Sequence, residues 1–65
     1  MSKLNMSKLR FFLKKLEGLT VEIGTEYGPV SGVLVEVEFD YVVLRTNNNL
    51  VYVPLASIQY INYLK

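Results

Sequence analysis

The chain has 65 residues, of which 51% are hydrophobic, and it contains neither cysteine nor histidine. A domain of this size buries only about 60% of the surface that its unfolded chain exposes, so its core alone gives marginal stability. The composition argues against a disulfide framework, a structural zinc site and catalysis by a cysteine or by a serine activated by histidine. We therefore expect a non-enzymatic protein without cofactor or bound metal, stabilised by association with further copies of itself.

The net charge of +1 hides an uneven distribution. Residues 1–18 contain five basic residues against one acidic residue, whereas residues 19–65 contain two basic residues against five acidic ones. A basic segment is thus joined to an acidic body. No apolar run approaches the ~20 residues needed to span a bilayer, and the first residues lack the apolar core of a secretion signal. We expect an intracellular, cytoplasmic protein.

The spacing of apolar residues predicts an amphipathic helix from about Leu4 to Glu17. At ~100° per residue, five apolar side chains fall within one sector, which we expect to pack against the rest of the domain. Asn5 or Ser7 could cap the start of this helix, and Gly18 its end. The apolar sector consists of Met6, Leu9, Phe12, Leu13 and Leu16.

The opposite side of the helix carries a second, narrow apolar stripe made of Leu4 and Phe11. Lys8 and Lys15 flank this stripe. Leucine and phenylalanine in a basic surround could contact a neighbouring subunit, a membrane surface or nucleic acid, whereas the simplest alternative is a solvated helix face. The sequence alone does not decide between these alternatives for the stripe.

After Gly18 the apolar residues alternate with polar ones, which predicts five short antiparallel strands separated by turns. Proline, glycine and asparagine mark the turns. We expect the strands at residues 19–26, 30–38, 41–45, 50–53 and 58–61, with a single-turn corner at residues 55–57. The expected fold is mainly β, with an N-terminal helix in residues 1–18 and a small, bent, five-stranded antiparallel barrel in residues 19–65, all in one domain.

The long apolar stretch Val30–Phe39 is the centre of this arrangement. We expect Gly32 to permit a bend and Leu34 to face the interior, whereas Val37 falls on the opposite side by simple alternation. Glu36 and Glu38 then mark the point where the strand leaves the covered region. With Asp40 they could hold hard cations around a pore, but a solvated strand end is the favoured interpretation.

The last two predicted strands are apolar on both faces. Exposed edges of this composition aggregate unless another strand pairs with them. We therefore predict that these strands form the contacts between subunits. The predicted interface residues are Leu50, Val51, Tyr52, Val53, Ile58, Tyr60 and Ile61.

The pattern as a whole resembles the Sm-like fold. The resemblance rests on Gly18 before a Val-x-Ile strand, Gly28 at the first turn, a Gly32-x-Leu34 motif in the long strand and the corner Val53-Pro54-Leu55-x-x-Ile58, and it covers residues 9–61. More narrowly, VSGVLVEVEFDYVVLR and VYVPLASIQYI are similar to small Sm-like proteins of unknown function from spore-forming bacteria, some of them spore coat proteins. The resemblance implies a ring in which the fourth strand of one subunit pairs with the fifth strand of the next.

RNA-binding members of the Sm-like family hold bases with an Asp-x-x-x-Asn motif at the tip of the long strand. Here valine, Val42, occupies the position of the asparagine, and the lysine and histidine of the bacterial RNA chaperone are missing from the corner at Pro54. Phe39, Asp40 and Tyr41 are the residues that could still form a ligand or RNA loop.

These features lead us to expect a self-associating structural or scaffold subunit, with a spore-associated assembly as its setting. The alternative is an RNA-binding Sm-like regulator. RNA stays open without being favoured, a peripheral membrane contact is not expected, and no small-molecule substrate is expected.

Overall fold

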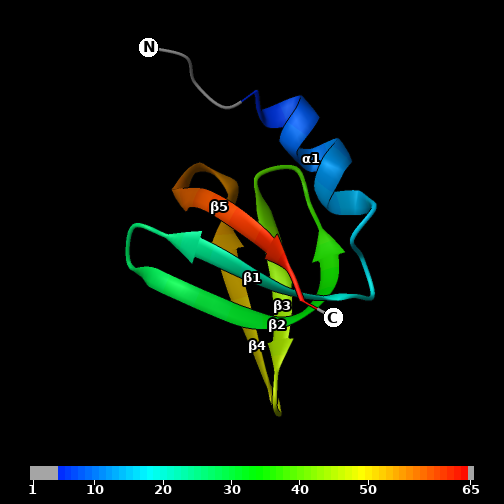
Figure 1. The fold of residues 1–65 in the computed structure, drawn as a ribbon. Coiled ribbons are helices and arrows are strands. Elements are labelled where there is room, and N and C mark those ends of the chain that lie inside the picture. Colours follow the sequence, from blue (N-terminus) through cyan, green and yellow to red (C-terminus); the bar gives the residue numbers. More distant parts are fainter. Residues whose placement is uncertain (1–4, 65) are drawn as a thin grey trace.

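The computed structural model describes residues 5–64, which form one α-helix followed by five β-strands (Figure 1). The prediction of a mainly β protein with an N-terminal helix is confirmed. The elements are α1 (Met6–Lys14), β1 (Thr20–Thr25), β2 (Gly28–Val37), β3 (Tyr41–Thr46), β4 (Asn49–Pro54), the 3₁₀ turn η1 (Leu55–Ser57) and β5 (Ile58–Tyr63).

All five strands belong to one antiparallel sheet with the order β4-β3-β2-β1-β5. β4 and β5 lie at its two ends, and the ladders of the described residues do not join them. The sheet is therefore not closed, and the closed Sm-like barrel expected from the sequence is not confirmed.

The sheet nevertheless curls strongly. β4 ends at Pro54 and β5 begins at Ile58, so four residue steps carry the chain from one edge of the sheet to the other. A flat sheet of five strands would separate its edge strands by about 19 Å. Four residues of extended chain reach at most about 14 Å. The edge strands must therefore approach each other, and β4 passes behind β1 in Figure 1.

Asn5, one of the two predicted capping residues, is the N-cap of helix α1. Its Oδ1 accepts hydrogen bonds from the backbone N–H groups of Ser7 (3.0 Å) and Lys8 (3.2 Å). The helix ends at Lys14, earlier than predicted, and residues 15–18 form a series of turns. Gly18 is therefore not its direct cap. It is the last residue of these turns, with φ +89°, and its N–H donates to the Leu34 carbonyl oxygen at 2.8 Å.

The helix contacts the sheet through the middle of its predicted apolar sector. Leu13 is fully buried, and Leu9 and Leu16 are partly buried against the core. Met6 and Phe12, at the two margins of the sector, stay 37% and 48% exposed. The packed face of α1 is thus narrower than the apolar spacing suggests.

Strand β2 contains a bulge that corrects one prediction. The register changes between Leu34, which pairs with Leu44, and Glu36, which pairs with Val43. The additional residue shifts the alternation, so both Leu34 and Val37 are buried, and the prediction that they lie on opposite sides is wrong. This register change follows Gly32 by two residues in the same strand.

A side chain from outside the sheet satisfies the backbone next to the bulge. The N–H of Val37 donates to Oε2 of Glu17 at 3.2 Å. Glu17 lies in the turns after α1, so this hydrogen bond connects the end of the helical segment to the strand. The core of the domain lies on the inner side of the curled sheet, where Leu13 of α1 joins it. It contains Leu13, Val21, Ile23, Leu34, Val37, Val42, Leu44, Val53, Leu55 and Ile58.

Candidate functional site

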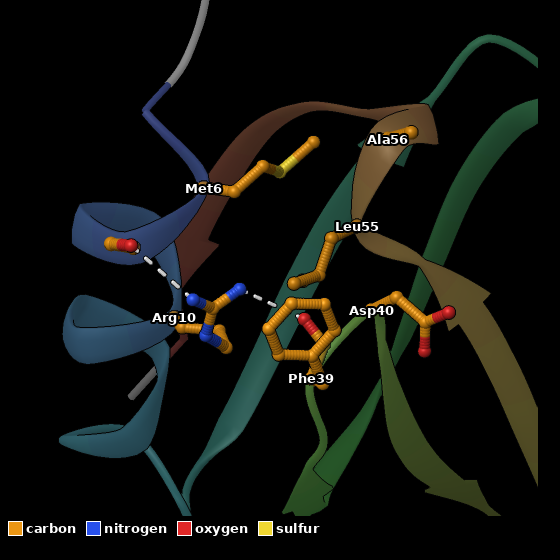
Figure 2. Close-up of a pocket in the computed structure, with 7 residues that line it drawn as sticks. Met6, Arg10, Phe39, Asp40, Leu55 and Ala56 are labelled. Atoms are coloured by element: carbon orange, nitrogen blue, oxygen red, sulfur yellow. Dashed lines mark hydrogen bonds between the residues drawn. The ribbon is translucent and has the colours of Figure 1, made fainter.

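A hollow of about 310 Å³ opens between the start of α1, the β2–β3 loop and the turn η1 (Figure 2). Most of its wall is apolar, with one guanidinium group and one carboxylate at its rim. The lining residues are Met6, Ser7, Arg10, Phe39, Asp40, Leu55 and Ala56.

Arg10 joins the helix to the β2–β3 loop. Its Nη1 donates to the carbonyl oxygen of Phe39 at 2.9 Å, and its Cζ lies 4.6 Å from the centroid of the Phe39 ring. Nη2 donates to Oγ of Ser7 at 3.3 Å (Figure 2). The Phe39 ring is 76% exposed, so its position depends largely on this cation–π contact.

The loop itself is held by backbone hydrogen bonds. The N–H of Glu38 donates to the carbonyl oxygen of Tyr41 at 2.8 Å, and the N–H of Leu55 donates to the carbonyl oxygen of Asp40 at 2.9 Å. These bonds fix a tight connection where the sequence predicts one. Phe39 and Asp40 both line the hollow, as a ligand loop would require.

Tyr41, the third predicted loop residue, lies elsewhere. It starts β3, opposite Pro54, and its ring centroid is 5.7 Å from that of Tyr52 on β4. Partial burial and the nearby carboxylates of Glu38 and Glu36 raise the pKa of Tyr41. Tyr41 is therefore a packing partner of the β4 edge and not part of the hollow.

Carboxylates gather at the end of β2. A hydrogen bond with Glu38 and repulsion from its charge raise the pKa of Glu36, with a smaller contribution from Glu17, while Lys14 acts in the opposite direction. Among residues 5–64, no three acidic side chains are grouped closely enough to hold a metal ion. The structure therefore adds no support for a cation site on one subunit.

The raised pKa of Glu36 leads to a testable result. We expect the Glu36 carboxyl to titrate above the ordinary range of glutamate, and Glu38→Gln to lower its pKa because both the hydrogen bond with the Glu38 carboxyl and the repulsion from its charge are removed. A pKa raised by folding favours the protonated form, so the small contribution to stability is present at acidic pH and is lost as the pH rises through the folded-state pKa. NMR titration of the side-chain carboxyl carbons measures both values. An unchanged Glu36 pKa in Glu38→Gln would contradict this assignment.

The predicted subunit contacts on β4 divide into two faces. Leu50 and Tyr52 are 53% and 60% exposed, whereas Val51 and Val53 turn towards the core. A groove of about 160 Å³ runs along this edge. It is lined by Thr25, Tyr27, Val30, Val51, Tyr52, Val53, Pro54 and Ser57.

Strand β5 shows a similar division. Ile58 is buried and Ile61 is partly buried, whereas Tyr60 is 45% exposed. The Tyr60 ring covers the backbone of Gly24, where a Cβ atom would overlap it. Its hydroxyl donates to Oε2 of Glu22 at 3.4 Å.

Sequence reasoning missed one exposed residue of this edge. Tyr63 is 54% exposed at the end of β5, opposite Val21 of β1. The prediction ended the strand at Ile61, two residues early. The alternation of Ile61, Asn62 and Tyr63 is the signal that could have extended it.

Comparison with known families identifies the family of this chain. Residues 9–62 match the family described as "Domain of unknown function (DUF2642)". The chain belongs to this family. No curated protein and no solved structure matches it. The matched part of this DUF2642 chain begins in the middle of α1 and extends almost to the end of β5, so it contains Arg10, the β2–β3 loop and the residues of both sheet edges.

The outer side of α1 in this DUF2642 chain presents Phe11, which is 66% exposed. Nζ of Lys15 lies 4.6 Å from the centroid of the Phe11 ring, and Lys8 is exposed nearby on the helix. Leu4, the other member of the predicted stripe, lies outside the described residues. Among the residues that the structure describes, no helix has the length and apolar character needed to cross a membrane.

Proposed function

We propose that the protein is a non-enzymatic structural or scaffold subunit, and that copies associate by pairing β4 of one subunit with β5 of the next. The observation that carries this proposal is the position of these two apolar strands at the two ends of an open sheet. The resemblance to small Sm-like proteins of spore-forming bacteria makes a spore-associated assembly the setting that we propose.

An edge strand presents a row of backbone N–H and C=O groups that can pair with another chain. Natural proteins protect such edges with charges, proline or a covering segment. On β4 the exposed side chains include Leu50 and Tyr52, and on β5 they include Tyr60 and Tyr63. Large apolar and aromatic side chains of this kind are enriched at protein interfaces.

The groove beside β4 adds a second reason. Val30 and Val51 pack against the core and also line this groove, so the core is incompletely covered at this edge. A strand added to β4 would extend the sheet across this region and cover the groove. Burial of this apolar surface is the gain expected for a domain too small to bury it alone.

The two edges have different sequences, so the proposed contact is head-to-tail. Repetition of such a contact produces a closed ring when the rotation closes, and a filament when it does not. In the order β4-β3-β2-β1-β5, the strands β4 and β5 each have one unpaired edge. These are the two strands that pair between subunits in the ring that the Sm-like resemblance implies. We therefore propose that the curled sheet is an Sm-like barrel completed in the assembly.

Light scattering coupled to size-exclusion chromatography tests this proposal. We expect a mass several times the 7.5 kDa of one chain. Tyr52→Asp places a charge in the proposed contact, where it loses its hydration, so we expect association at least ~10-fold weaker.

Phe39→Asp is the matched control, because it introduces the same charge at an exposed aromatic residue that belongs to neither β4 nor β5. Its mass should remain that of the wild type. A wild-type protein that stays monomeric at micromolar concentration would refute the proposal, and a Tyr52→Asp assembly of unchanged mass would remove Tyr52 from the contact.

The RNA-binding alternative receives less support from the geometry of the hollow. Phe39 is the ring best placed to stack on a base, but Arg10 already covers one of its faces. Asp40 adds a negative charge at the same rim, which opposes a phosphate backbone. Fluorescence anisotropy with short U-rich and A-rich RNA at two salt concentrations distinguishes the two functions, because a scaffold shows no saturable binding at either.

A further inference from the structure

We propose that the outward side of α1 is a docking surface for an anionic lipid bilayer. We call this surface the helix face, and it comprises Phe11 at its centre with Lys8, Arg10, Lys14 and Lys15 around it. The sequence alone did not favour a membrane contact, because a frayed, solvated helix would explain the same residues. The structure favours docking over a frayed helix, because α1 is capped and packs on the sheet through the buried Leu13.

Phe11 occupies the outermost position of the helix. At ~100° per residue it lies about 160° from both Leu9 and Leu13, which face the core. Its ring is two-thirds exposed, although an aromatic residue at this position contributes nothing to the packing of the domain. A single exposed aromatic residue is common on protein surfaces, so the significance of Phe11 depends on the residues around it.

The surroundings of Phe11 are cationic on both sides. Lys8 and Lys15 flank it on one side and Arg10 and Lys14 on the other, and the helix Met6–Lys14 contains no acidic residue. Long basic side chains with a large apolar residue between them form the pattern of an interfacial helix. The ring enters the acyl boundary while the cations remain at the level of the lipid phosphates.

The basic side chains of the helix face differ in their interactions with neighbouring groups. Arg10 turns towards the Phe39 carbonyl, and the charge of Lys14 offsets part of the rise in the pKa of Glu36. Lys15 instead lies over the Phe11 ring. Phe11, Lys8 and Lys15 therefore form the part of the helix face that contributes most to docking.

A lipid surface fits this face better than RNA does. Recognition of single-stranded RNA uses open aromatic platforms together with side chains that form hydrogen bonds with base edges. Lys15 covers one side of the Phe11 ring, and Ser7 is the only neutral polar side chain in Met6–Lys14. A lipid surface requires only positive charge and an apolar group that can be inserted.

One such face binds weakly, because it inserts a single ring. In a cyclic assembly all copies of α1 lie at the same level along the rotation axis, so their faces can meet one plane together. Effective concentration then strengthens the overall attachment without any new contact. This last step depends on the proposed self-association, whereas the docking of one face does not.

Vesicle sedimentation tests the inference, with the full chain and vesicles of phosphatidylcholine alone or mixed with phosphatidylglycerol. We expect binding to the anionic vesicles only, and weaker binding at high salt. Phe11→Ser and the double variant Lys8→Glu/Lys15→Glu should each reduce binding on the order of tenfold or more. Phe12→Ser is the matched control, since it removes a half-exposed phenylalanine from another side of the same helix and should bind like the wild type.

Circular dichroism and light scattering without lipid establish that each variant keeps its fold and mass. A monomer whose anionic-vesicle binding requires Phe11 would support this inference and refute the assembly. The inference would be overturned if the assembled protein did not bind anionic vesicles, or if Phe11→Ser bound them as strongly as the wild type. Saturable binding to short U-rich RNA that Phe11→Ser abolishes, without vesicle binding, would assign the helix face to RNA and also overturn it.

Discussion

Leu13→Ala is expected to unfold much of the protein at low concentration. Leu13 is the one residue of α1 that is fully buried, and it attaches the helix to the core. Truncation of a buried leucine to alanine costs about 2–5 kcal/mol, and a chain of this length has a free energy of unfolding of roughly 3–10 kcal/mol. The loss is therefore comparable with the total. Urea unfolding followed by far-UV circular dichroism measures it.

Phe12→Ala provides the control within the same helix. Phe12 is adjacent in the sequence but 48% exposed, so its truncation should cost about 1 kcal/mol or less. Because association stabilises the folded chain, both variants must be compared with the wild type at equal protein concentration. Equal midpoints for Leu13→Ala and Phe12→Ala would show that α1 is not anchored through Leu13.

Gly32→Ala is expected to destabilise the sheet by about 1–3 kcal/mol, although it adds a single methyl group. A Cβ atom at Gly32 would lie 2.6 Å from the carbonyl oxygen of Arg45 and 2.9 Å from Cγ2 of Thr46. The first of these contacts is with backbone, so relief requires β2 and β3 to move apart. Thermal or urea unfolding should show the loss.

Gly24→Ala makes the comparison informative. A Cβ atom at Gly24 would overlap the Tyr60 ring more severely, but that ring is 45% exposed and can rotate away. We therefore expect Gly24→Ala to destabilise the fold less than Gly32→Ala. If Gly24→Ala were the more damaging variant, the Tyr60 ring would be the more rigid neighbour and the reasoning for Gly32 would fail.

The elements with a clear hydrophobic period could be predicted from the sequence. The helix, the five strands and the Asn5 cap, as one of two candidates, all follow from local patterns. The apolar character of β4 and β5 likewise indicated the strands that lie at the edges of the sheet. Local patterns succeed here because each strand pairs with its neighbour in sequence, except for β5.

The errors arise where a contact distant in sequence decides the local geometry. Alternation alone places Val37 opposite Leu34, but the bulge turns both residues inwards, and the Glu17 carboxylate satisfies the Val37 N–H. The packing of the Tyr41 ring beside Tyr52 is likewise set by the pairing of β3 with β4. The hollow depends on Arg10 reaching Phe39, 29 residues away, and no local pattern indicates this contact.

The place of β5 in the sheet also determines the order in which the chain can close. Tight turns connect β1 to β2 and β3 to β4. The last residue pairs before these turns are Thr25 with Gly28 and Thr46 with Asn49. β5 instead pairs Ile58 with Thr25, across a far longer loop, and closing that loop costs about 2 kcal/mol more in chain entropy. We therefore expect the four-stranded meander to form before β1 acquires its second neighbour. Until then, the vacant side of β1 is a template that accepts β5 from its own chain or from another.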